Sequence, residues 1–196
     1  MTGRRGLTEQ DVIDAATLLV ETEGTSALTL SRVARELGVK PPSLYNHVAG
    51  LDTLRRDVAL RAVEDLGHRL GLAAMGRTGQ NALSAMAAEF RAYATTHPNL
   101  YALTTQIPAD NEYVTASLTS MEPVVAILRG YHLEFEETIH AARILRSALH
   151  GFVSLETLGG FGIDVDLDRS FEWLVETFAR ALESSLTDRQ TTNSAD

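Results

Sequence analysis

Polar side chains able to hydrogen-bond to another molecule are concentrated in residues 40–47, KPPSLYNH. Leu44 and Val48 are four residues apart, so they would hold a short helix against a neighbouring helix and leave its other side chains facing outward. The outward side chains are then Ser43, Tyr45, Asn46 and His47, preceded by Lys40. This composition on a short exposed helix is typical of a recognition helix in a DNA major groove.

The residues just before this segment predict the helix that supports it. Thr29 can cap that helix at its start, and Gly38 can adopt the left-handed conformation that ends it. Pro41 and Pro42 suit the first turn of the following helix, because proline lacks the N–H that a first turn leaves unpaired. The inward stripe of the supporting helix consists of Val33, Ala34 and Leu37.

Residues 29–48 resemble the DNA-binding part of the tetracycline-repressor (TetR) family of bacterial transcription regulators. The family pattern TL..VA..LGV....LY.HV is met at Thr29, Leu30, Val33, Ala34, Leu37, Gly38, Val39, Leu44, Tyr45, His47 and Val48. The resemblance implies an all-α fold with an N-terminal three-helix helix-turn-helix DNA-binding domain and a larger helical ligand-binding and dimerisation domain. The alternative, a helical hairpin with a polar outer face, leaves the outward polar run unexplained.

The overall charge is less informative than its distribution. The 196-residue chain has a net charge of −9, which by itself disfavours a nucleic-acid partner. Residues 1–60 carry seven Lys or Arg and eight Asp or Glu, whereas residues 61–196 carry ten and eighteen. The acidic excess therefore belongs to the C-terminal part, and phosphate contacts by the N-terminal part stay possible.

The chain contains no cysteine, which rules out disulfides and zinc fingers. Its N-terminus shows no apolar signal core, and no apolar run approaches the roughly 18 residues needed to span a bilayer, so we expect no membrane partner and a cytoplasmic protein.

Breaks in the apolar pattern suggest the domain boundaries. Thr8 and Asp11 have the spacing of a capping box, which predicts a first helix from Thr8 that ends at Gly24. Arg4 and Arg5 precede it, either as an arm that reaches DNA or as a solvated terminus. The expected parts are a flexible arm (1–7), the helix-turn-helix domain (8–50), a connecting helix (51–70), a helical ligand-binding and dimerisation domain (71–186) that opens with a linker at 71–80, and a disordered tail (187–196).

DNA contacts divide into positioning and specifying roles, and the sequence alone leaves open which side chain has which role. We expect Ser43, Tyr45 and Asn46 near bases. We expect phosphate contacts from Thr29, Lys40, Tyr45 and His47. Family members often carry a lysine near the start of the connecting helix, but this chain has Leu51, Asp52 and Thr53 there. A phosphate contact at that point would fall to Thr53, to Arg55 and Arg56, or to the N–H groups of the helix N-terminus.

Three further helices are predicted between residues 81 and 128. One runs from Asn81 and stops before Pro98, a short one covers about 99–106, and Pro123 should kink or restart a third. Aromatic, methionine and aliphatic side chains in this region predict a site for a small, largely apolar effector. These residues are Phe90, Tyr93, Leu103, Met121, Val125 and Phe152, with His150 as a polar candidate. Each has the alternative of simply filling the core.

Residues 134–158 predict a helix with two apolar faces, one through Leu145 and Leu149 and one through Ile144 and Leu155. Such a helix needs two neighbours, which can be its own subunit and a partner. In the family, the last two long helices form a four-helix dimer interface, which implies a homodimer through residues near 134–158 and 168–186. The run LHGFVSLETLGGFG, followed by SFEWL, resembles a subgroup with a W/L-H-G element.

No residue pattern predicts catalysis, a metal site or a cofactor. No two of His68, His97, His132, His140 and His150 have the spacing of helical metal ligands, and no HExxH occurs. Asp164, Asp166 and Asp168 lack the glycine and closing glutamate of a calcium loop. The sequence therefore predicts a regulator that binds an operator and is not an enzyme. The alternative is a helical ligand-binding or scaffold protein that does not read DNA.

Overall fold

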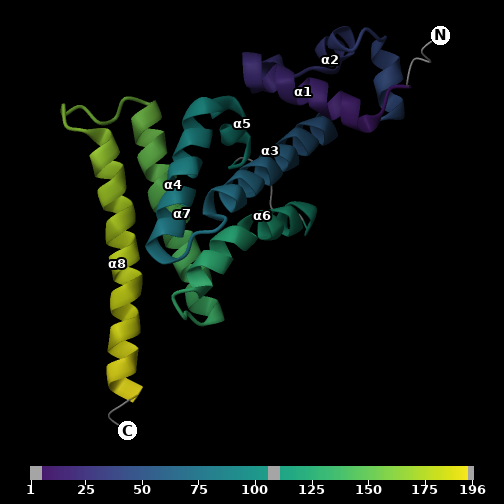
Figure 1. Ribbon diagram of the computed structural model, residues 1–196. Coiled ribbons are helices and arrows are strands. Elements are labelled where there is room, and N and C mark those ends of the chain that lie inside the picture. Colours follow the sequence, from purple (N-terminus) through teal and green to yellow (C-terminus); the bar gives the residue numbers. More distant parts are fainter. Residues whose placement is uncertain (1–5, 106–110, 194–196) are drawn as a thin grey trace. The chain divides into compact units, whose positions relative to one another are not determined.

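The computed structural model describes residues 6–105 and 111–193, and in this part of the chain every regular element is a helix (Figure 1). The all-α expectation is therefore confirmed. The chain forms two compact units. Of the described residues, those up to 65 and from 97 to 117 form the first unit, and those from 66 to 96 and from 118 onward form the second. Two helices, α3 (Leu51–Ala74) and α6 (Asn111–Arg129), run from one unit into the other.

The first unit begins with the predicted capped helix. In α1 (Glu9–Glu23), the Thr8 hydroxyl accepts a hydrogen bond from the Asp11 N–H, and the Asp11 carboxylate accepts one from the Thr8 N–H at 2.8 Å. Gly24 ends the helix with φ +83°, a conformation that favours glycine. A short 3₁₀ turn, η1 (Thr25–Ala27), then leads to α2 (Leu30–Glu36) and η2 (Pro41–Asn46).

One apolar core holds these elements together. It contains Val12 and Leu19 of α1, Val33 of α2, and Leu44 of η2, all buried. The short helix α5 (Pro98–Leu103) contributes Leu100 to the same core, although it follows the second unit's α4 (Gly79–Thr96) in the chain. The sequence predicted a helix at about 99–106; α5 ends at Leu103, and residue 106 lies outside the described residues.

The predicted break at residues 71–80 is partly wrong, because α3 continues through Ala74. Its glycines serve close packing instead. A Cβ on Gly67 would lie 2.5 Å from the Cβ of Ser120 in α6, and a Cβ on Gly71 would lie 3.2 Å from Cγ of Pro123. Glycine at these two positions therefore lets α3 approach α6. Pro123 itself does not restart the helix, since α6 continues as one helix through Arg129.

The second unit is completed by α7 (Phe135–Thr157) and α8 (Leu167–Asn193). Helix α4 lies against both of them (Figure 1). The sequence placed the end of the last helix at 186, whereas α8 continues to Asn193. Residues 194–196 of the expected tail lie outside the described residues.

Helix α7 has two apolar faces, as the sequence predicted. One face is buried within the second unit by residues such as Leu145, Leu149 and Phe152. The other face is exposed in the single chain: Ile144 is 59% exposed and Leu155 is 48% exposed. Half-buried Gly151 lies between them, and a Cβ placed on it would meet no atom within 4 Å.

Candidate nucleic-acid interface

Helix α2 and the segment after it form the predicted helix-turn-helix. Thr29 caps α2, its hydroxyl accepting a hydrogen bond from the Arg32 N–H at 3.3 Å. Gly38 has φ +67°, the left-handed conformation required where the chain turns away from α2. The Val39 N–H then donates to the Ala34 carbonyl at 2.9 Å, which closes the turn. Leu44 and Val48 are buried against the first unit's core.

The second element of the motif differs from the predicted α-helix, because residues 41–46 form the 3₁₀ helix η2. Its hydrogen bonds span three residues, as from Ser43 N–H to Lys40 carbonyl (2.9 Å) and from His47 N–H to Leu44 carbonyl (2.8 Å). Pro41 and Pro42 remove two N–H donors at its start, and the remaining segment is too short to develop regular α-helical bonding.

The side chains predicted to contact DNA lie on the accessible side of this motif. Tyr45 is 62% exposed. Thr29, Lys40, Asn46 and Thr53 are also exposed, and Ser43 and His47 are half-buried. Residues 40–47, which we call the recognition segment, are therefore anchored by one buried leucine and present polar groups on the other side.

Charges around the recognition segment leave one cation available. Within the described residues, Lys40 makes no ion pair, whereas Arg32 is paired with Glu23. At the start of α3, Arg55 lies 3.3 Å from Asp52, and both side chains are exposed. An exposed pair of this kind is weak, so a phosphate could replace Asp52 as the partner of Arg55.

The predicted effector residues do not form one group. Leu103 belongs to the core of the first unit, whereas the other six belong to the second unit. Among these, Phe90, Tyr93 and Phe152 are buried, and Met121, Val125 and His150 are half-buried. Met121 packs against the cluster of Leu128, Tyr131, Ala141, Ala142 and Leu182.

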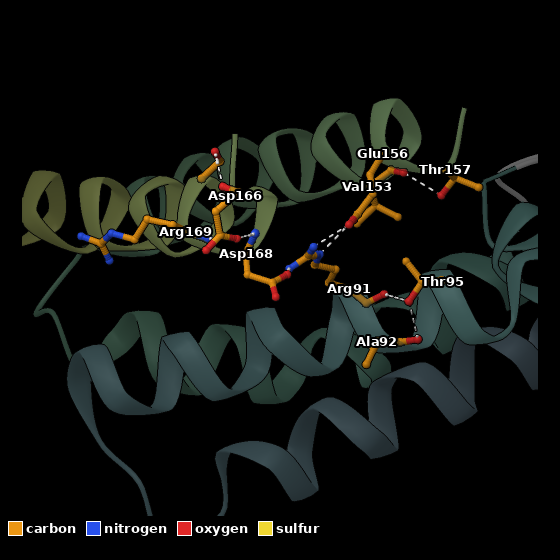
Figure 2. Close-up of polar contacts among 10 residues, drawn as sticks. Arg91, Ala92, Thr95, Val153, Glu156, Thr157, Asp166, Asp168 and Arg169 are labelled. Carbon is orange, nitrogen blue, oxygen red and sulfur yellow. Dashed lines mark hydrogen bonds and ion pairs between the residues drawn. The ribbon is translucent and has the colours of Figure 1, made fainter. Parts of the chain in front are cut away.

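Sequence reasoning missed Arg91 of α4, whose side chain joins three helices of the second unit. Figure 2 shows its guanidinium extending toward Glu156 near the end of α7 and Asp168 at the start of α8. Two nitrogens of Arg91 bind the Glu156 carboxylate, one at 2.9 Å, and Nη1 lies 2.8 Å from Asp168. The hydrogen bonds to Glu156 raise the pKa of Arg91 above its ordinary value, so this cation stays charged.

Aromatic rings complete the surroundings of Arg91. Its guanidinium carbon lies 5.6 Å from the ring centre of Phe152 and 5.0 Å from that of Phe171, distances at which the ring faces attract a cation. A cavity of about 580 Å³ adjoins Arg91 and Glu156, and it is otherwise lined by residues 161–168. None of the seven predicted effector residues lines this cavity.

The described residues contain no group of three or more His, Cys, Asp or Glu placed to hold a metal ion. Over the same part of the chain, no helix is both long and apolar enough to cross a membrane.

Together, the fold and the exposed polar segment define a helix-turn-helix DNA-binding protein. Residues 12–49 match the family described as bacterial regulatory proteins, tetR family, and residues 83–178 match the family described as tetracyclin repressor-like, C-terminal domain. An uncharacterized HTH-type transcriptional regulator of Mycobacterium tuberculosis, Rv0681, is 38% identical over 184 residues, which cover 92% of this chain and 84% of that protein. The chain therefore belongs to the TetR family of transcriptional regulators.

Solved structures support the same fold. A protein of unknown function from Rhodococcus sp. RHA1 has a TM-score of 0.79 at 21% identity, covering 93% of this chain and 99% of that protein. The TetR family protein ActR of Streptomyces coelicolor, solved in complex with (S)-DNPA, has a TM-score of 0.67 at 19% identity, covering 93% of this chain and 100% of ActR. At these identities the likeness concerns the fold alone.

Proposed function

We propose that this regulator is a homodimeric repressor that binds a palindromic operator and releases it when a small, largely apolar molecule binds. The observation that carries the proposal is the recognition segment, which exposes Lys40, Tyr45 and Asn46 on a helix-turn-helix whose other side is buried. Such a segment can enter a major groove, and a dimer would place two of them about 34 Å apart, one DNA turn. Binding to chromosomal DNA implies action in the cytoplasm.

Different side chains have different roles in this proposal. Ser43, Tyr45 and Asn46 contact base edges. Thr29, Lys40 and His47 position the protein by contacting phosphates, and the Tyr45 hydroxyl contributes a further phosphate contact. Thr53 supplies a phosphate contact at the start of α3. Lys40 is the sharpest of these assignments, because it is exposed and makes no ion pair among the described residues.

The exposed face of α7 supports the homodimer. Ile144 and Leu155 are large apolar side chains in contact with water, and Gly151 between them has open space where a side chain would fit. A glycine inside an exposed helix lowers the stability of the helix by about 1 kcal/mol relative to alanine. A close approach by the α7 of a second subunit would explain why glycine occupies position 151. α8 adds Trp173, which is 63% exposed.

The effector site is assigned to the second unit. Phe90 and Tyr93 of α4, Met121 and Val125 of α6, and Phe152 and His150 of α7 are its predicted residues. Leu103 lies in the first unit's core, and we no longer assign it to this site. A protein of the same fold, ActR, is known in complex with a small molecule, which supports a ligand role for this domain. The effector acts only through its preference for the form of the dimer that does not fit the operator.

Selection of random DNA duplexes by the purified protein, followed by sequencing, tests the DNA-binding function. We expect enrichment of one two-fold symmetric site. Lys40→Ala should weaken binding to all duplexes and lower the slope of log affinity against log salt by about 1 per subunit. Arg77→Ala, at an exposed position in the second unit, is the matched control and should leave the slope unchanged. Recovery of no duplex above background at low salt would favour the helical protein that does not read DNA.

Sedimentation equilibrium tests the homodimer. Gly151→Leu should yield a folded monomer, since the added side chain meets open space within the chain but obstructs a second helix. Ala92→Leu is the control, because Ala92 is exposed on α4 and lies outside α7 and α8. A wild-type protein that stays monomeric at tens of micromolar would contradict the proposed assembly.

A screen of small apolar compounds for thermal stabilisation of the protein tests the effector role. Compounds that stabilise the protein should weaken its affinity for the selected operator, by linkage. If every stabilising compound leaves operator affinity unchanged, the protein is not a ligand-responsive repressor of this kind.

A further inference from the structure

Helix α5 belongs to the first unit by its packing but follows the second unit in the chain. The boundary between the units falls between Thr96, the last residue of α4, and His97, which precedes α5. Leu100 and Leu103 of α5 are each only 8% exposed, in the same core as Val12 and Leu19 of α1. Helix α4 of the second unit is therefore joined through His97 directly to an element of the DNA-binding unit.

The end of α1 is capped by a side chain from this element. In the last turn of a helix the carbonyl groups have no partner within the helix, and they must find one elsewhere. In α1, the Gly24 N–H donates to the Val20 carbonyl at 2.8 Å. The next carbonyl, of Glu21, instead accepts a hydrogen bond from Nδ2 of Asn99 in α5, at 3.0 Å. Asn99 thus takes over part of the capping of α1.

The side chain of Glu21 contacts His97, the residue that precedes α5. His97 Nδ1 lies 2.6 Å from Glu21 Oε1, and both side chains are about three-quarters buried. An ionised carboxylate can only accept a hydrogen bond, so Nδ1 carries the proton. The second carboxylate oxygen, Oε2, is buried and has no hydrogen-bond partner among the described residues. His97 is therefore a significant support for this carboxylate.

Glu21 lies next to the turn that leads into the helix-turn-helix. After it come Gly24 and η1, and then Thr29, which caps α2. The Asn99 side chain also reaches this turn, since a Cβ on Gly24 would lie 3.6 Å from Asn99 Oδ1. A displacement of α5 thus acts on the backbone where α1 turns toward α2, and the position of α2 sets that of the recognition segment.

We propose that Asn99 and His97 are positioning residues that couple the effector domain to the DNA-binding unit by clamping the last turn of α1. The proposal rests on the proposed function, because it assumes that the two units communicate. It identifies the two polar contacts, to the Glu21 carbonyl and the Glu21 carboxylate, as the link that makes α1 follow α5. The buried leucines of α5 keep the two helices together, and the polar contacts fix their register.

Hydrogen exchange with and without operator DNA tests this coupling, because linkage between two sites works in both directions. The probe is the duplex recovered by selection. In the wild-type protein, the duplex should slow exchange at residues 29–48, where it binds. It should also slow exchange about fivefold in α5, for example at the Tyr101 amide, which donates to the His97 carbonyl.

The variant His97→Ala/Asn99→Ala removes both polar contacts while retaining the buried leucines. It should still bind the duplex and protect residues 29–48, but its α5 amides should exchange at the same rate with and without DNA. Thr105→Ala is the matched control, because it removes a hydrogen bond within the same region, from the Thr105 hydroxyl to the Ala102 carbonyl, that does not reach α1. The control should keep the fivefold effect.

The outcomes separate the two proposals. Loss of all protection at residues 29–48 in the wild type would overturn DNA binding and, with it, the coupling. Protection at 29–48 without protection of α5, or an undiminished effect in the double variant, would overturn the coupling alone. A purely structural role would speed exchange in α5 equally with and without DNA and keep their ratio. If the double variant loses its helical circular dichroism, Asn99→Asp, which replaces the donor by an acceptor of the same shape, carries the same test.

Discussion

The contacts that stabilise the helix-turn-helix segment and those that stabilise the second unit differ in how far apart their residues lie in the chain. In residues 8–50, the caps join residues three apart, Thr8 to Asp11 and Thr29 to Arg32, and the turn depends on one glycine, Gly38. In the second unit, Arg91 binds a carboxylate 65 residues away, and Gly67 meets a residue on another helix. The caps and the turn of the DNA-binding segment are therefore specified locally, whereas these contacts of the second unit join residues far apart in the chain.

This difference fits the two tasks. A recognition segment must present a fixed surface to DNA, and local caps and turns fix the backbone of such a segment. A domain that accommodates a ligand depends on how whole helices meet, so residues such as Arg91 and Gly67, which join helices, determine its shape. Loss of a distant contact should consequently cost more stability than loss of a local one.

The largest effect is expected for Gly67→Val. The added Cβ would lie 2.6 Å from the Cα of Ser120, a backbone atom that cannot move aside without shifting α6. We expect a loss of about 3 kcal/mol or more in the free energy of unfolding, measured by urea denaturation. Gly71→Ala is the graded control, since its Cβ would meet the Pro123 ring at 3.2 Å, and it should change stability by less than about 1 kcal/mol. Equal effects of both variants would contradict the close crossing of α3 and α6.

Arg91→Ala should have the next largest effect. It leaves the Glu156 carboxylate, whose side chain is 18% exposed, without its cation, and it removes the stacking on Phe152 and Phe171. We expect a loss on the order of 2–3 kcal/mol in urea denaturation.

Arg169→Ala separates burial from charge in this comparison. Arg169 binds two carboxylates as Arg91 does, Glu172 at 3.0 Å and Glu176 at 3.2 Å, but on the surface of α8. Because water screens such exposed pairs, its loss should be close to undetectable in the same denaturation experiment. A loss as large as that of Arg91→Ala would mean that the number of ion pairs, and not their burial, determines the stability of this unit.

The range of the contacts also explains which features were predictable from the sequence. The first helix with its capping box, the Thr29 cap and the left-handed Gly38 were all predicted, because each depends on residues within a few positions of one another. The two apolar faces of α7 were predicted because helical spacing repeats along one segment. The 3₁₀ type of the helix at 41–46 was not predicted, since two prolines suit the start of an α-helix as well as that of a 3₁₀ helix.

The features missed from the sequence depend on partners far away in the chain. Gly71 was interpreted as part of a linker, because a glycine marks either a break or a close approach, and only its partner Pro123 distinguishes the two. Arg91 gave no signal, since nothing in its neighbourhood points to Glu156. His97 was considered as a metal ligand and lacked a second histidine at the required spacing, whereas its carboxylate partner, Glu21, lies 76 residues away.

A smaller effect is expected where the local contacts of the helix-turn-helix segment are removed. Thr8→Ala removes the hydroxyl that accepts from the Asp11 N–H and donates to the Asp11 carboxylate, while the Thr8 backbone N–H keeps its bond to that carboxylate; α1 should lose about 1 kcal/mol. Thr22→Ala is the control within the same helix, because its hydroxyl donates to carbonyls of the preceding turn, Leu18 at 2.8 Å and Leu19 at 3.4 Å, and caps no helix end. Thermal unfolding of both variants gives the measurement, and a Thr8→Ala effect as large as that of Arg91→Ala would remove the distinction between local and distant contacts.

At pH 8 no loss of stability is expected from the substitution Tyr131→Phe, in the second unit. Its ring is 3% exposed, and its buried hydroxyl has no hydrogen-bond partner among the described residues. Tyr131→Phe should therefore leave stability at pH 8 unchanged or raise it by up to about 1 kcal/mol. Burial, with the nearby charge of Glu183 as a smaller cause, raises the pKa of Tyr131 above its ordinary value of 10.0.

The sign of the pH effect follows from that direction. Below pH 10 the tyrosine is protonated in both states, and its contribution to stability is constant. Above pH 10 the unfolded chain loses the proton while the folded one keeps it, so the folded state is progressively destabilised until the pH passes the raised pKa. Urea denaturation at pH 8 and pH 10.5 should show a smaller alkaline loss in Tyr131→Phe than in the wild type. A variant less stable than the wild type at pH 8 would instead indicate a hydrogen bond to the Tyr131 hydroxyl. The packing of Tyr131 in its cluster with Leu128, Ala141, Ala142 and Leu182 would then depend on that polar contact as well as on apolar burial.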